Sequence, residues 1–265
     1  MPRLFALLLC LPLSGCLLQG NWIPTIWGGA VLEAGTVQSE DGCTATVDAF
    51  VVSVLQGALL TPEGTASAVL HGGQLFDLVP PGPQSMASID VRKGPYPETV
   101  FFLGPAEEPG PNTFVGRGKL VGTDNAASDL NPVLGNATEA QRDAMIAAGA
   151  TALVEGTLTC VSGGVQEARA FRWLLVDDEG LLRCAGPSLE IEGGSFGASV
   201  LTAAGERLFP DPEDGSMLPL WSAGADGVIL LEDVDAAGLQ TPLRDRLRSL
   251  FSSEAPCTWE ALDPL

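Results

Sequence analysis

The sequence predicts a β-rich α+β fold, built from antiparallel sheet or sheets with two or so helices. Hydrophobic residues make up 46% of the 265 residues and charged residues 17%, so a sizeable core can be buried and a wholly disordered acidic chain is excluded. Short runs of β-branched and aromatic residues alternate with loops rich in proline and glycine. Two segments have the apolar spacing and boundary residues of helices.

Residues 1–15 have the features of an export signal. Arg3 is the only charge in this segment, and an apolar run follows it. A membrane-spanning helix needs about 20 apolar residues, whereas Pro12 and the small residues after Leu13 interrupt this run early. We therefore expect cleavage of this segment.

The sequence Leu13-Ser14-Gly15-Cys16 resembles the lipobox of bacterial lipoprotein precursors. The resemblance covers residues 1–16 only. It implies that the Cys16 thiol receives a diacylglycerol and becomes the mature N-terminus, and that Leu17 directs the protein to the outer membrane. The alternative is an ordinary secretory signal that is cut elsewhere.

The chain is strongly acidic, with a net charge of −20, and removal of Arg3 makes it one unit more negative. Lys93 and Lys119 are the only lysines. Because a polyanion would be repelled, we expect no nucleic-acid partner. We expect the protein to be attached to a membrane through the covalent lipid on Cys16. An envelope protein is a further candidate partner. The sequence predicts no cofactor.

Four cysteines remain in the predicted mature chain besides the lipid-bearing one: Cys43, Cys160, Cys184 and Cys257. An even number in an exported chain predicts two disulfides. Zinc is the competing interpretation, but no two of these cysteines have the short spacing of a zinc site, and His71 is the only histidine.

Residues 16–42 are expected to form a lipidated tether that leads into a globular domain at 43–265. Trp22 and Trp27 lie in this tether, either at the membrane interface or packed on the domain. The first predicted strand is Thr44–Leu55, and shorter strands are predicted at 66–70, 87–91, 99–103 and 114–121.

Three strand-like runs follow, separated by Ser162-Gly163-Gly164 and by residues 177–180, and predict an antiparallel meander. In that meander Cys160 and Cys184 lie on the two outer strands, roughly 9–10 Å apart, which exceeds the roughly 7 Å limit for a disulfide. We therefore expect each of them to pair with Cys43 or Cys257.

Two helices are predicted. The first has Asn136 as its N-cap, Glu139 three residues later, and Gly149 as its end. The second has Thr241 as its N-cap and Pro242 in its first turn. Its apolar face consists of Leu243, Leu247, Leu250 and Phe251, while Arg244, Arg246 and Arg248 are expected on a solvated face.

The two halves of the domain, near 43–155 and 156–265, share faint similarities. Cys43 with AFVVSV is similar to Cys160 with AFRWLLV, and SAVLHGGQLF is similar to ASVLTAAGERLF. The offsets drift between these pairs, so a diverged duplication is an alternative to a single domain.

Ser195 lies in a G-x-S-x-G match between a predicted strand and a helix-compatible segment, as a hydrolase nucleophile would. The resemblance to the α/β-hydrolase elbow fails in three ways: residues 189–192 alternate in polarity, no histidine follows the serine, and parallel βαβ alternation is missing. One alternative is a hydrolase in which Ser195 works with His71, which lies upstream. The other is a plain glycine turn.

Two acidic clusters are candidates for calcium binding because calcium prefers several oxygen ligands. They are Asp211, Glu213 and Asp214, and Glu232, Asp233 and Asp235. Both lack the alternating pattern of a dedicated calcium loop, so solvated turns are favoured.

Together these observations favour a lipid-anchored envelope protein of structural or binding type. One alternative is an envelope serine hydrolase that uses Ser195 and His71. The other is a partner-binding module that presents the C-terminal amphipathic helix.

Overall fold

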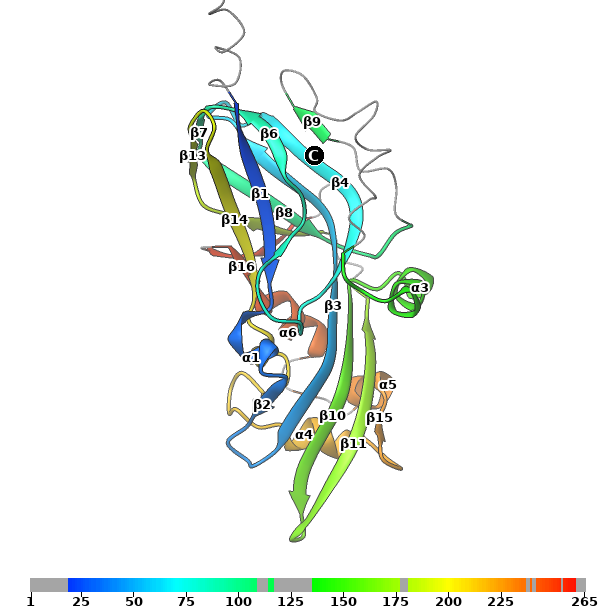
Figure 1. Ribbon diagram of the computed structural model, residues 1–265. Helices are drawn as coiled ribbons and strands as arrows, with labels where there is room; N and C mark the ends of the chain where they lie inside the picture. Colours follow the sequence, from blue (N-terminus) through cyan, green and yellow to red (C-terminus); the bar gives the residue numbers. More distant parts are fainter. Residues whose placement is uncertain are drawn as a thin grey trace, which may run out of the picture.

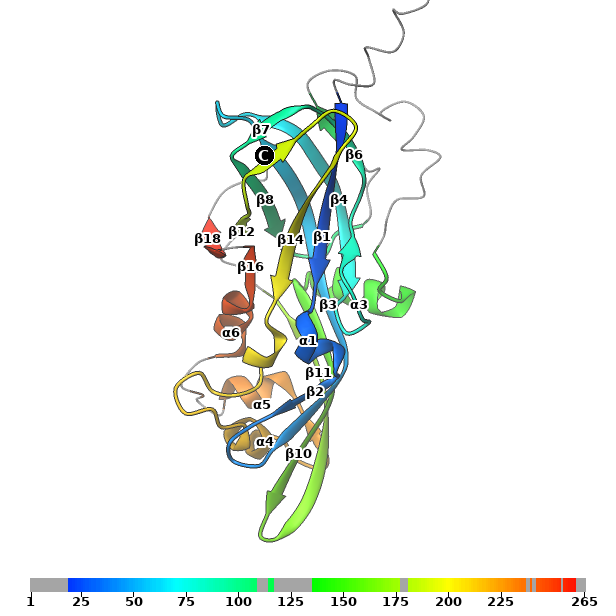
Figure 2. The same ribbon diagram turned by 60° about the vertical axis from the view of Figure 1, so that its left-hand side comes forward.

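A computed structural model of the chain describes residues 19–108, 114–116, 135–176, 181–236, 239, 242–253 and 255–260. The predicted β-rich α+β fold is confirmed. The body is elongated: β1 begins at one end, and the hairpin of β10 and β11 projects from the other (Figures 1 and 2). In chain order the elements are β1 (Gln19–Trp27), α1 (Gly29–Glu33), β2 (Thr36–Gln38), β3 (Thr44–Leu60), β4 (Ala66–Asp77), β5 (Gln84–Ser85), β6 (Ile89–Arg92), β7 (Gly94–Tyr96), β8 (Glu98–Leu103), β9 (Phe114–Gly116), α3 (Glu139–Ala148), β10 (Ala152–Ser162), β11 (Val165–Leu175), β12 (Leu181–Ala185), β13 (Leu189–Ile191), β14 (Phe196–Ala203), α4 (Leu218–Ala223), β15 (Val228–Ile229), α5 (Leu231–Ala236), α6 (Leu243–Leu250), β16 (Phe251–Ser253), β17 (Ala255–Pro256) and β18 (Thr258–Glu260).

Strand β3 is the centre of the larger sheet, which has the order β15-β11-β10-β3-β8-β12-β18, with β2 and β4 also paired to β3 and β9 paired to β4. From Ala49 to Leu60 nearly every residue of β3 is buried, because other segments cover both faces of the strand. The predicted strand at Thr44–Leu55 is thus confirmed and extends further.

The smaller sheet is mixed. Its order is β17-β16-β14-β1-β5, with β6 also paired to β1. β1 and β14 are parallel, with Asn21 opposite Phe196 and Trp27 opposite Thr202. A second parallel pair, β11 with β15, lies in the larger sheet. Most strand pairs are antiparallel as expected, and these two pairs are the parallel ones among the described strands.

The expected tether at 16–42 is wrong from residue 19 onwards, because this segment forms β1, α1 and β2. Trp22 and Ile26 are fully buried, and Trp22 Nε1 donates a hydrogen bond to Ser199 Oγ at 2.9 Å. The Trp22 ring also lies against Gly57 of β3, where an added Cβ would be 3.6 Å from it. Trp22 therefore packs between the two sheets, as the domain-packing alternative expects.

The hairpin of β10 and β11 is confirmed, with Gly163 and Gly164 at φ 59° and 84° in its two-residue turn. Cys160 lies opposite Glu167. The third strand of the predicted meander is misplaced: β12 pairs with β8 and β18 instead of β11. The outer edge of β11 instead carries β15 at residues 170 and 171.

Both disulfides follow the expected pattern. Cys43 pairs with Cys160, and Cys184 pairs with Cys257. The expectation that Cys160 and Cys184 bond to the other two cysteines is confirmed, although the meander argument behind it holds only for the hairpin.

Helix α3 ends at Gly149 as expected, with φ of 60°, but its N-cap is Thr138 rather than Asn136. Thr138 and Gln141 form a capping box, whereas the Asn136 amide bonds the backbone N–H and C=O of Asp77. Five α-helices occur in the described part of the chain, more than the two expected.

The described strands do not separate into two halves. A boundary at 155/156 would cut β10, at the point where its register with β3 shifts. The similar segments also have unlike neighbours, since β4 pairs with β3 whereas β14 pairs with β1 and β16. The main core contains Trp22, Phe50, Trp173 and Phe209, drawn from the whole length of the chain. None of the described helices is long and apolar enough to cross a membrane.

Candidate functional site

Ser195 lies in the turn between β13 and β14, and its hydroxyl is used by that turn. Its Oγ donates to the Glu192 carbonyl at 2.8 Å and accepts from the Glu192 N–H at 3.0 Å. The next element is strand β14, not a helix. The strand–turn–helix geometry of a hydrolase elbow is therefore absent at Ser195, which favours the plain-turn alternative.

His71 belongs to the larger sheet, on β4 opposite Gln56 of β3. Its side chain lies outside the part of the structure that is described. Its position within a long β4 corrects the expected strand end at residue 70.

In the acidic cluster at 211–214, the carboxylates of Asp211 and Asp214 make local hydrogen bonds, and Asp211 also forms an ion pair. Asp211 is 7% exposed, and its Oδ2 accepts a hydrogen bond from Arg246 Nη2 at 2.8 Å. Asp211 Oδ1 accepts from the Glu213 N–H, and Asp214 Oδ1 from the Ser216 N–H. Among the described residues no group of three or more side chains is placed to hold a metal ion.

The cluster at 232–235 lies on α5. The side chains of Glu232, Asp233 and Asp235 are exposed, and Asp235 lies 3.8 Å from Arg244. This matches the solvated alternative for the cluster.

Arg246 corrects the expectation of a solvated arginine face on α6. It is 2% exposed, and its Nη1 also donates to the Phe209 carbonyl at 2.8 Å. Burial lowers the pKa of Arg246, while the charges of Asp211 and Asp214 oppose that shift. The arginine is thus a buried connection between α6 and the segment after β14.

The apolar face of α6 packs into the main core. Leu243, Leu247 and Leu250 are each at most 2% exposed. So is Phe251, which the sequence placed on this face but which begins β16. The predicted helix is confirmed, but its leucine face is covered by this chain and is not a docking face for a partner.

The projecting hairpin of β10 and β11 is the remaining candidate for a binding surface. β3 begins at Thr44, opposite Thr159 of β10, so the hairpin continues beyond the start of β3 (Figure 1). Val161 and Val165 are 58% and 59% exposed. Val161 faces Gln166 and Val165 faces Ser162 in neighbouring positions of the ladder, so the two valines lie on opposite faces of the tip.

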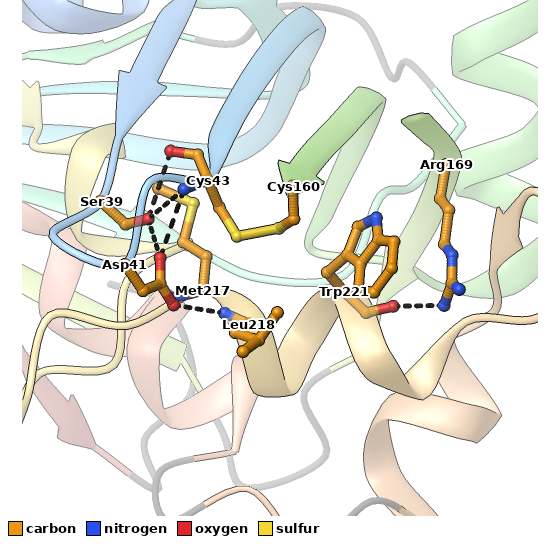
Figure 3. Close-up of a disulfide and its surroundings, with 8 residues drawn as sticks. All are labelled: Ser39, Asp41, Cys43, Cys160, Arg169, Met217, Leu218 and Trp221. Carbon is orange, nitrogen blue, oxygen red and sulfur yellow. Dashed lines mark hydrogen bonds between the residues drawn. A yellow bond between two sulfur atoms is a disulfide. The ribbon is translucent and has the colours of Figure 1, made fainter. Parts of the chain in front are cut away.

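The first strand of the hairpin base, β10, is held by the Cys43–Cys160 disulfide and the turn before β3 (Figure 3). In that turn Asp41 Oδ2 accepts hydrogen bonds from the N–H groups of Met217 at 2.8 Å and Leu218 at 2.7 Å. Burial opposes ionisation of Asp41, but hydrogen bonds from Ser39 and from the Leu218, Met217 and Cys43 N–H groups outweigh it and lower its pKa. The charged carboxylate therefore ties this turn to the start of α4.

The second strand of the hairpin base, β11, is held by Arg169. Its guanidinium lies 3.8 Å from the centre of the Trp221 ring, and its Nη1 donates to the Trp221 carbonyl at 2.7 Å (Figure 3). The same Nη1 also donates to the Gly224 carbonyl. These contacts fix β11 to α4. A hairpin that is held at its base and exposes apolar side chains at its tip suits binding, because an already ordered segment loses less conformational entropy on contact.

The disulfide and the contacts of Asp41 and Arg169 together form a brace at the base of the hairpin. The sequence predicted a disulfide at Cys160 but not the other contacts. The Gly163-Gly164 turn predicted the hairpin, but no local pattern connects Asp41 with residues 217 and 218, or Arg169 with Trp221. These contacts join segments more than 50 residues apart.

Comparison with protein-family models gave no match, and neither the curated proteins nor the solved structures compared with the chain include a similar one. The functional conclusion therefore depends on the residues and geometry of this chain.

Proposed function

We propose that the chain is a lipid-anchored protein of the bacterial cell envelope, attached to the outer membrane through Cys16, with a structural or binding role. The lipobox-like sequence supports the anchor, and Leu17 supports the outer membrane. The elongated body supports the structural or binding role, because the start of β1 and the β10–β11 hairpin lie at opposite ends of it (Figure 2).

The observation that carries the proposal is the short distance along the chain from Cys16 to the fold. β1 begins at Gln19. Three residues span at most about 11 Å when fully extended. An acylated Cys16 would thus hold the body directly at the membrane, with the hairpin directed away from it.

Expression of the full precursor in a bacterium that processes lipoproteins tests the anchor. We expect the intact mass of a chain that starts at Cys16 and carries acyl groups, recovered with membranes. Cys16→Ala should lose both the acyl mass and the membrane recovery. A mature chain that starts at another residue and has no acyl mass would contradict the proposal.

A binding role, as opposed to a purely structural one, is favoured by the exposed tip of the hairpin. Photo-crosslinking residues placed at Val161 and Val165 in cells should give one discrete product. The control position is Val200, an exposed valine on β14. Equal crosslinking at all three positions would argue against a specific role for the tip.

The hydrolase alternative can be tested on the same preparations. A fluorophosphonate probe should not label the wild-type protein. Labelling that disappears in Ser195→Ala would contradict the structural or binding role.

A further inference from the structure

The end of the molecule at which β1 begins carries an exposed aromatic side chain beside the predicted anchor. We infer that this end, centred on Phe196, contacts the bilayer surface and that Phe196 inserts at its interface. The inference rests on the proposed lipid anchor and adds the residues that touch the membrane.

The turn before β14 is bonded to the first residues of β1. The Gly194 N–H donates to the Gln19 carbonyl at 2.7 Å, and the Asn21 N–H donates to the Ser195 carbonyl at 2.9 Å. Phe196 then lies opposite Asn21 in the parallel ladder. Phe196 is thus fixed close to Gln19, three residues from Cys16.

Phe196 is 69% exposed, the highest value among the large hydrophobic residues whose side chains are described. Its neighbours on β14 divide between two faces: Ser199 and Leu201 are buried inward, whereas Ala198 and Val200 are exposed on the outer face with Phe196. Phe196 therefore contributes little to the core, and burial of its ring in a membrane interface removes apolar surface from water.

Residues of both charges lie at the same end of the molecule as Phe196. Arg92 lies opposite Gln19 on the other side of β1, and exposed Lys93 follows it. Neither takes part in an ion pair with any other described residue. Lys93 shares the lining of an open hollow with Glu190 and Glu192.

This mixture of charge determines which membrane surface fits. Asp90 adds a further exposed carboxylate near the two cations. An end with both signs gives no net attraction to anionic lipids, but it can match the phosphate and ammonium groups of zwitterionic headgroups. Contact should therefore depend on apolar insertion and change little with the content of anionic lipid.

The test uses the full lipidated chain with an environment-sensitive fluorophore on a single introduced thiol. Phe196→Cys places it at the proposed contact, and Val165→Cys places it at the hairpin tip, which has similar exposure. Both proteins are reconstituted into phosphatidylethanolamine and phosphatidylcholine vesicles, with and without phosphatidylglycerol. Flotation with the vesicles measures anchoring separately.

We expect both proteins to float. The label at position 196 should show blue-shifted emission and severalfold slower quenching by aqueous iodide, whereas the label at 165 should not, with or without phosphatidylglycerol. If both proteins float but the two labels are quenched equally, the contact is wrong and the anchor stands. If the protein has no acyl groups and does not float, the proposed function fails and the contact fails with it.

Oxidative footprinting provides a check on the unsubstituted chain. Phe196 should be oxidised severalfold less in the vesicle-bound wild-type protein than in soluble Cys16→Ala, while Val165 should be oxidised equally in both. Equal oxidation of Phe196 in the two states would overturn the inference even if labelling had disturbed the turn.

Discussion

At the residue scale, the most consequential contact is the buried ion pair of Arg246 and Asp211. Arg246 was expected in solvent and Asp211 was a candidate calcium ligand, yet both are nearly inaccessible and bond each other. Two charges in a protein interior persist when they are paired and hydrogen-bonded, and here the Phe209 carbonyl provides a further acceptor.

Loss of one partner of this pair should be strongly destabilising. Arg246→Ala leaves the Asp211 carboxylate buried without its cation, and we expect the free energy of unfolding in urea to fall by about 3–5 kcal/mol. The control is Arg244→Ala on the same helix, whose exposed contact with Asp235 is expected to contribute about 0–1 kcal/mol. Similar losses in the two variants would contradict the role assigned to Arg246.

Asp77 gives a prediction about pH. Burial raises the pKa of Asp77 in the folded chain, although the Phe50 and Val79 N–H groups bond its carboxylate and oppose the shift, and Glu155 adds a repulsive charge. As pH rises past about 3.8, the ordinary pKa of an aspartate, Asp77 therefore ionises in the unfolded chain before it ionises in the folded one. Ionisation of Asp77 therefore disfavours the folded state as pH rises through this window.

Asp77→Asn removes that effect and keeps an oxygen that can accept both N–H bonds. The free energy of unfolding of Asp77→Asn minus that of the wild type should therefore be larger at pH 7 than at pH 3. Chemical unfolding of both proteins across this range measures the difference. A difference that is independent of pH would show that Asp77 does not titrate as proposed.

At the scale of elements, the hairpin depends on its brace. The Cys43–Cys160 disulfide joins residues separated by 117 positions, and removal of a native disulfide typically costs about 2–5 kcal/mol. In Cys43→Ala/Cys160→Ala we expect this loss together with faster amide exchange across residues 160–169. Cys184→Ala/Cys257→Ala should leave exchange in the hairpin nearly unchanged, because that bond joins β12 to the segment before β18. Equal acceleration in the two double variants would argue against a local brace.

The ends of strands and helices were predicted well from the sequence where a short motif, such as a turn glycine, determines them. The two glycines between β10 and β11 favour a two-residue hairpin turn, and Gly149 ends α3 in the left-handed conformation. The N-cap of α3 was misplaced because Asn136 and Thr138 both suit a cap, and a bond from Asn136 to β4 decides between them.

The candidate site was harder to predict than its elements. Ser195 matched a catalytic motif, but its hydroxyl bonds its own turn, and β14 follows because β1 and β16 pair with it. The exposed valines of the hairpin have no motif. Their exposure follows from their position on the part of the hairpin that extends past the start of β3.

At the scale of the whole molecule, the first strand is part of the core rather than a tether. β1 lies between β14 on one side and β5 and β6 on the other, and it contributes Trp22 to the contact between the sheets. Its residues should therefore be required for folding even though they lie close to the predicted anchor.

Truncation provides the test. A chain that begins at residue 19 should fold without lipid, with one cooperative thermal transition and both disulfides formed. A chain that begins at residue 43 should fail to fold, because Ile26 and Trp22 are removed from the core and three strands, β5, β6 and β14, lose their pairing with β1. Cooperative unfolding of the shorter chain would restore the tether interpretation.

The sequence by itself determined the β-rich class, a strand that starts at Thr44, the hairpin turn, the amphipathic face of α6 and the cysteines available for two disulfides. These features depend on periodicity, turn residues and composition, which act over a few neighbouring positions. The tertiary structure alone decided the parallel pairing of β1 with β14, the burial of Arg246 against Asp211 and the contacts of Asp41 and Arg169 at the base of the hairpin. The physical reason is distance along the chain: Trp22 and Ser199 are 177 residues apart, and only the packing of the whole core brings such partners together.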